Sequence, residues 1–86
     1  MAVSFNPNPM TSSSIVKYQL PESGQLNIHA YNMNGSDCGI LFSGYKFKGD
    51  QQFIINKNAR MQMPGMYFIS ITLNQKQKIN KLLITN

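Results

Sequence analysis

The clearest structural signal in the sequence is the stretch Met66-Tyr67-Phe68-Ile69-Ser70-Ile71-Thr72-Leu73. Its odd-numbered positions carry tyrosine, isoleucine, isoleucine and leucine, whereas serine and threonine occupy two of the even-numbered positions. An apolar residue at every second position is typical of a strand with one face buried. The stretch therefore predicts a half-buried β-strand, and we expect the rest of the chain to be built around similar elements.

The same alternation recurs along most of the chain, and turn signals separate the alternating segments. These further segments are Ser14–Leu20, Gln25–Met33, Gln51–Asn56 and Lys76–Thr85. Pro21 to Gly24, Asn34-Gly35 and Asn74-Gln75 suit tight turns, and Gly44 and Gly49 are interpreted as further breaks. Turn signals spaced by about 8–12 residues indicate a sandwich or barrel. We predict an all-β fold, a seven-stranded antiparallel immunoglobulin-like β-sandwich.

The size and composition of the chain limit what it can be. Its 86 residues, 42% of them hydrophobic, match one small domain. A chain of this size buries one thin core and leaves no room for a cleft between two lobes. Cys38 is the only cysteine. No intramolecular disulfide can therefore reinforce the core, which must depend on packing and strand pairing.

The sequence shows no targeting segment. Met1-Ala2-Val3-Ser4 leads directly into Asn and Pro, without the basic and apolar regions of a signal peptide. The longest apolar stretch, Gly65–Leu73, is interrupted by Ser70 and Thr72 and is shorter than the ~20 residues of a transmembrane helix. We expect no stable membrane insertion, and either a cytoplasmic chain or a piece of a longer precursor.

The net charge of +5 raises the question of a nucleic-acid partner. Lys46 and Lys48 flank Phe47, and further lysines lie near the carboxyl end. A basic stripe interleaved with aromatic residues can bind nucleic acid. However, arginine, the commoner base reader, occurs only at Arg60. We favour lysines that protect exposed strand edges from aggregation, and expect no nucleic-acid partner.

Reactive side chains are few. The three carboxylates, Glu22, Asp37 and Asp50, fall at expected turns, where such groups commonly form local hydrogen bonds. His29 is the only histidine and is expected on the outer face of a strand, whereas Cys38 is expected to be a small buried hydrophobic residue. The sequence has no glycine-rich phosphate loop and no paired Cys and His ligands. We therefore predict no catalytic residue, no metal site and no cofactor.

Five motifs follow one another in a fixed order along the chain. They are Phe5-Asn6-Pro7-Asn8-Pro9-Met10, Leu20–Ile28 with its Leu-Pro-Glu-Ser-Gly start, Tyr31-Asn32-Met33-Asn34-Gly35, Met63-Pro64-Gly65-Met66-Tyr67-Phe68 and the basic-apolar Asn80–Ile84. Their order and spacing resemble those of type A C-terminal sorting domains of the type IX secretion system (Por secretion). The resemblance extends from about residue 5 to residue 86. The chain departs from it at Asn32, where the family usually has Asp, at Met10, where Phe is common, and at Asn86, where many members end on Lys.

The resemblance implies a role without catalysis. Such domains form the carboxyl end of proteins that Bacteroidota export through the type IX outer-membrane translocon. It implies a fused N-terminal cargo, transit through the periplasm, recognition by the translocon and an outer-membrane shuttle, and delivery to the cell surface or the extracellular space. A sortase-like cysteine protease commonly removes the domain. Under this hypothesis residues 1–4 are an added start or a linker, and residues 5–86 are the sorting domain.

Candidate recognition residues lie in the terminal strand, because a strand edge near a free carboxyl end can add to a partner sheet or insert into a receptor. They are Lys78, Lys81, Leu82, Leu83 and Ile84. The last three fit a core-completing strand equally well. The motif residues with an expected structural role are Pro7, Asn8, Pro9, Gly24, Gly35, Gly65 and Tyr67.

Two other functions remain open from the residues alone. The first is an immunoglobulin-like adhesion or carbohydrate-binding module, although Trp is absent and Tyr45 and Phe47 offer few aromatic faces for a sugar. The second is a small nucleic-acid-binding barrel, suggested by the sequence pI of about 9.6 and the segment Tyr45–Lys48.

Overall fold

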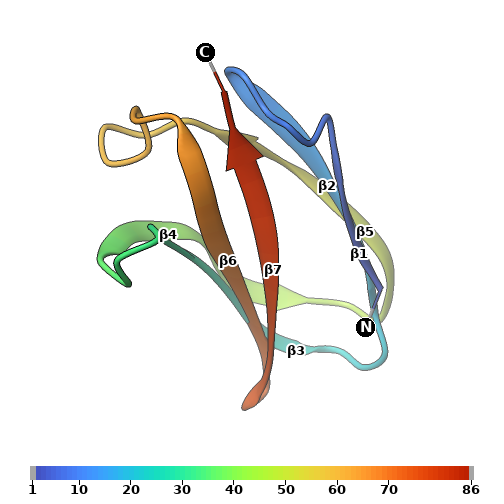
Figure 1. Cartoon of the computed structure of the whole chain (residues 1–86). Coiled ribbons are helices and arrows are strands. Elements are labelled where there is room, and N and C mark those ends of the chain that lie inside the picture. The colour runs from blue at the N-terminus through green and yellow to red at the C-terminus, as the bar shows by residue number, and fades with distance from the viewer. Residues whose placement is uncertain (1, 86) are drawn as a thin grey trace.

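The computed structural model describes residues 2–85, which form seven strands in two antiparallel sheets (Figure 1). The first sheet has the order β1 (Val3–Asn6), β2 (Ser13–Leu20) and β5 (Gly49–Asn56). The second has the order β4 (Asp37–Lys46), β3 (Gly24–Tyr31), β6 (Gly65–Leu73) and β7 (Lys76–Ile84). The all-β, seven-stranded prediction is confirmed. In immunoglobulin terms β1, β2 and β5 correspond to strands A, B and E, and β3, β6 and β7 to C, F and G.

The core lies between the two sheets and is built from the alternating positions of their strands. In β2, Val16, Tyr18 and Leu20 are buried while the residues between them are exposed. In the opposite sheet β6 is flanked by β3 and β7, and its four odd-numbered apolar side chains from Tyr67 to Leu73 are all buried. Full burial of one such side chain contributes about 1.5–3 kcal/mol. Apolar contact between the inner faces therefore joins the sheets.

The least regular strand is β4, and one expectation about it was wrong. Gly44 was expected at a break in the chain, but it lies inside β4 and pairs with Leu26. The register between β3 and β4 shifts twice, around His29, and Gly39 has a φ of 103°. These bulges remove the clean period of two that makes a strand visible in a sequence. By contrast, the hairpin expected at Asn34-Gly35 is confirmed, since it joins β3 to β4.

The start of the chain also forms part of the sheet. β1 begins at Val3, so the second half of the expected linker, residues 3 and 4, pairs with Lys17 and Tyr18 of β2. Met1 and Asn86, which figured in the expectations about the start and the terminus, lie outside the described residues.

A tyrosine anchors the connection that leads into β6. The Tyr67 hydroxyl donates a hydrogen bond of 2.6 Å to the Met63 carbonyl oxygen, four residues upstream, while its ring is buried in the core. This is the arrangement of the tyrosine corner that immunoglobulin-like domains carry at the start of strand F. Between the two residues, Gly65 has a φ of 147°, a conformation that side-chain-bearing residues rarely adopt.

A second polar link joins two turns at the other end of the sandwich. Asn74, in the turn between β6 and β7, accepts a hydrogen bond from the Gln25 backbone N–H and donates one to the Ser23 carbonyl oxygen. A Cβ at position 24 would overlap the Asn74 amide. A side chain there would therefore displace this amide and break both hydrogen bonds between the turns.

The tyrosine corner can be tested by removing one oxygen atom. We expect Tyr67→Phe to lower the free energy of unfolding by about 1 kcal/mol, because the buried ring stays while the hydrogen bond is lost. Urea titration followed by circular dichroism measures the change. Tyr45→Phe is the matched control, since Tyr45 is 61% exposed and should change stability by less than about 0.5 kcal/mol. Equal stability of the two variants would contradict the anchoring role.

Candidate recognition site in the terminal strand

The terminal strand β7 has two halves that differ in burial. In its second half Leu82 and Ile84 are completely buried, and Leu83 is half-buried on the outer face of the sheet. In its first half every residue from Lys76 to Ile79 is exposed. Of the predicted recognition residues, Lys78 and Lys81 are therefore at the surface, whereas Leu82 and Ile84 belong to the core.

The Asn-Pro segment at the start of the chain covers the outer edge of the second half of β7. The Met10 N–H donates to the Leu83 carbonyl oxygen at 2.8 Å, and the Thr85 N–H donates to the Met10 carbonyl oxygen at 2.8 Å. The Asn8 side chain accepts a hydrogen bond from the Leu83 N–H at 3.1 Å and donates a longer one to the Lys81 carbonyl oxygen at 3.4 Å. We call residues 8–10 the clip.

The clip also has contacts with the core and with β2, which hold it in place. Met10 is completely buried and forms an isolated parallel bridge with Ile84. Ser14 donates a hydrogen bond to the Pro7 carbonyl oxygen at 2.9 Å, and the bonds before Pro7 and Pro9 are both cis. A structural role was expected for Pro7, Asn8 and Pro9, but the sequence gave no sign that this segment pairs with the opposite end of the chain.

The first half of β7 presents a different edge. The backbone N–H and C=O groups of successive residues in a strand point alternately to its two sides. Those of Leu83 and Lys81 point away from β6, and those of Ile79 and Gln77 therefore point the same way. Within residues 2–85 no hydrogen bond joins the backbone of Ile79 or Gln77 to a segment on this side. Ile79 is 57% exposed, and the buried Nδ2 atom of Asn80 has no hydrogen-bond partner among the described residues.

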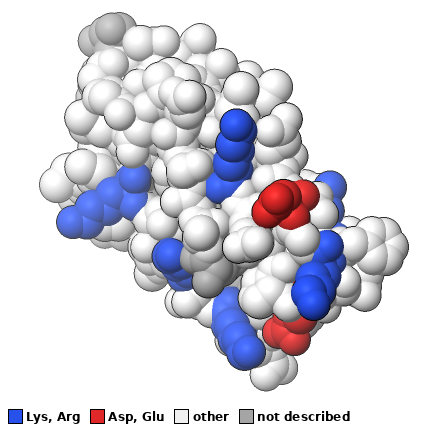
Figure 2. Space-filling model, turned by 90° about the vertical axis from the view of Figure 1, so that its right-hand side faces the viewer, with Lys and Arg blue, Asp and Glu red and all other residues white. Residues whose placement is uncertain are grey.

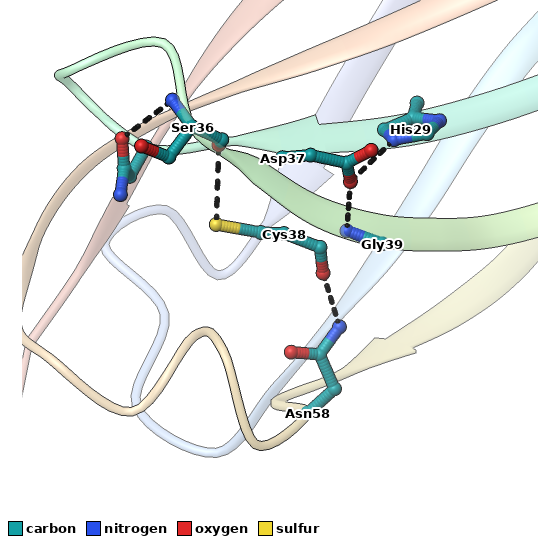
Figure 3. Close-up of polar contacts among 7 residues, drawn as sticks. His29, Ser36, Asp37, Cys38, Gly39 and Asn58 are labelled. Atoms are coloured by element: carbon teal, nitrogen blue, oxygen red, sulfur yellow. Dashed lines mark hydrogen bonds and ion pairs between the residues drawn. The ribbon is translucent and has the colours of Figure 1, made fainter.

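A polar cluster at the β3–β4 hairpin holds most of the reactive groups (Figure 3). The Asp37 carboxylate lies 2.6 Å from the His29 Nε2 atom and accepts a second bond from the Gly39 N–H at 2.6 Å. The hydrogen bond from His29, followed by that from Gly39, lowers the pKa of Asp37 below its ordinary value of 3.8. The His29 ring also stacks on Tyr31, with centroids 4.8 Å apart.

The cysteine of this cluster is separate from its histidine. The Cys38 side chain is buried, and its thiol points toward the Ser36 carbonyl oxygen at 3.7 Å, away from His29 (Figure 3). The Cys38 carbonyl oxygen accepts a hydrogen bond from Asn58, which fixes the long loop before β6. Histidine and cysteine thus lie apart, and each has a local structural partner.

No metal-binding group appears in the described part of the chain. Among residues 2–85, no three side chains of His, Cys, Asp or Glu lie close enough to hold an ion. The same residues contain no helix long and apolar enough to cross a membrane.

The basic side chains are dispersed on the face seen from the side of β1 and β5. Figure 2 shows Lys and Arg separated by uncharged atoms on this face, with acidic side chains between them. Lys46 lies over the Phe42 ring, 5.1 Å from its centroid, so part of the suspected Lys-Phe-Lys stripe is engaged within the molecule. On this face the charge forms no continuous track for a nucleic-acid backbone.

The aromatic residues considered for sugar binding also differ from a flat platform. Tyr45 and Phe47 are both exposed, but their rings meet edge to face at 79° with centroids 5.6 Å apart. The two rings do not form one surface on which a sugar could stack.

These features define an immunoglobulin-like domain whose distinctive surface is a strand edge. The chain matches the family model described as "Secretion system C-terminal sorting domain" over residues 4–85. It therefore belongs to the C-terminal sorting domains of the type IX secretion system of Bacteroidota, a family of cargo tags. Neither the curated proteins nor the solved structures compared with the chain gave a match.

The clip makes a prediction that hydrogen exchange can test. We expect Asn8→Ala to speed exchange of the Leu83 amide, which loses its acceptor, and to leave the Thr85 amide protected by Met10. NMR-detected exchange at single residues measures both amides in one sample. Asn27→Ala is the control, since among residues 2–85 the Asn27 side chain bonds only to the side chains of Gln25 and Ser43. Unchanged exchange at Leu83 in Asn8→Ala would contradict the clip.

The Asp37 pair predicts a pH dependence of stability. A carboxyl group whose pKa is lowered by folding stabilises the protein above its unfolded pKa, and this stabilisation is lost as pH falls through the folded pKa. We therefore expect Asp37→Asn to lower the melting temperature near neutral pH and the difference to shrink below about pH 4. Thermal unfolding at a series of pH values measures it. Asp50→Asn is the control, because Asp50 forms no ion pair within residues 2–85. A difference that does not change with pH would contradict the role of the charge.

Proposed function

We propose that this chain directs a protein fused to its amino-terminal side across the outer membrane, after transit through the periplasm. The type IX translocon and an outer-membrane shuttle recognise the folded domain through β7. A sortase-like cysteine protease then separates the domain from its cargo at the cell surface. The family match over residues 4–85 carries this proposal, because members of the family are tags for secretion to the cell surface or the extracellular space.

The surface of the domain supports recognition through an edge. One surface hollow is lined entirely by polar side chains, those of Gln25, Asn27, Thr72, Asn74 and Gln75, which suit hydrogen bonding to solvent. The polar cluster of His29, Asp37 and Cys38 is occupied by structural contacts. β7, in contrast, offers exposed lysines and outward backbone groups, the features by which a strand docks to a partner.

The proposal is tested by attaching a periplasmic reporter to residues 1–86 in a bacterium that has type IX secretion. We expect the reporter at the cell surface or in the medium in the parent strain, and in the periplasm in a strain without the translocon. A fusion that lacks residues 81–86 should also stay in the periplasm, since it loses Lys81 together with the buried Leu82 and Ile84. Normal delivery of the truncated fusion would overturn recognition through the terminal strand.

A further inference from the structure

The outer edge of β7 is covered along one half only. The clip bonds to Leu83 and Thr85, and more weakly to the Lys81 carbonyl oxygen. Beyond it the outward backbone groups of Gln77 and Ile79 and the N–H of Lys81 have no partner within residues 2–85. We call these groups the open edge. An unpaired row of N–H and C=O groups is a template for an added strand.

The side chains beside the open edge indicate the chemistry of a strand that could bind there. Ile79 is 57% exposed on the outer face, next to Ser70 of β6, and offers an apolar contact. Lys76, Lys78 and Lys81 are exposed around it, and Lys76 makes a loose contact with Glu22 at 3.7 Å.

The other edges of the two sheets are less suited to an added strand. β4, at the opposite edge of the same sheet, is bent by register shifts and carries Gly39 at a positive φ. Bulges of this kind protect an edge from pairing. β1 has only four residues, and the one charged side chain of β5, Asp50, is acidic and would repel an acidic strand.

We propose that the open edge of β7 accepts an acidic, extended segment of the secretion machinery as a fifth strand of the β4-β3-β6-β7 sheet. This inference rests on the proposed function and specifies its partner. The added strand pairs with Gln77 and Ile79 and ends at the Lys81 N–H, because the clip occupies the edge from there on. Its carboxylates lie near Lys76 and Lys81, and an apolar side chain contacts Ile79.

The first test uses the reporter fusion with the substitution Ile79→Pro. Proline lacks the N–H that an added strand needs, while the lost N–H points away from β6, so the existing ladder is preserved. We expect Ile79→Pro to reduce surface delivery at least tenfold and Ile79→Val, which keeps the N–H, to deliver normally. Circular dichroism of the isolated domains checks that both are folded.

Charge is tested with a pair of variants that does not alter the backbone. We expect Lys76→Glu with Lys81→Glu to reduce delivery at least fivefold. The matched control is Lys17→Glu with Arg60→Glu, which makes the same change in net charge at exposed basic residues outside β7. Equal delivery by both double variants would overturn the acidic partner.

The second test measures strand addition directly on the 86-residue chain. The probe is an eight-residue peptide of alternating Glu and Val with blocked ends, and the control peptide replaces Glu by Lys. In an NMR titration we expect shifts of the Gln77 to Lys81 amides with the acidic peptide, at least tenfold weaker binding by Ile79→Pro, and weaker binding as salt is raised. Shifts spread evenly over the surface, or equal binding of the Lys peptide, would overturn the proposal.

The two tests separate the inference from the function on which it rests. If the unsubstituted fusion is not delivered, the proposed function fails, and the peptide titration still decides whether the edge adds a strand. If the unsubstituted fusion and folded Ile79→Pro are delivered equally well, the open edge is not the docking site, although the sorting function stands. Loss of delivery in Ile79→Pro and in Lys76→Glu with Lys81→Glu, but not in their controls, supports both.

Discussion

Apolar contact between the inner faces of the two sheets is the constraint on which the whole domain depends. With Cys38 as its single cysteine, the chain has no disulfide to join the sheets. The buried side chains on the inner faces of both sheets must therefore hold them together. In a core this thin, the ends of the strands lie close to solvent and need contacts that hold them in place. The polar links at Tyr67 and Asn74 accordingly lie where connections between strands meet the core.

The same constraint explains the clip. A two-layer sandwich leaves an open seam wherever the outer strand of one sheet has no neighbour, and the core beneath Leu82 and Ile84 lies at such a seam. The buried Met10 side chain fills it, while the backbone of Met10 satisfies the Leu83 and Thr85 groups at the strand edge. The start of the chain thus completes the sheet to which the end of the chain belongs.

The sequence was sufficient for those parts of the fold in which local pattern decides structure. Period-2 alternation located β6 and the strands like it, and turn chemistry located most of their connections. It was insufficient for β4, because Gly39 and the register shifts break the alternation. It also could not show the clip: Asn8 and Leu83 are 75 positions apart and meet only after both sheets have formed. This non-local contact determines how much of the β7 edge is left uncovered, so the sequence could not show the extent of the candidate recognition site.

The division of β7 links recognition to folding. A signal confined to a flexible tail could be read before the domain folds, and its removal would leave the rest intact. Here Leu82 and Ile84 build the core, and the strand that they belong to carries Lys78 and Ile79 at its surface. The exposed half of β7 is held extended by its pairing with β6, and it continues directly from the half that is packed and clipped. A partner that adds a strand to this edge therefore selects the folded domain, since an unfolded chain would have to lose far more conformational entropy on binding.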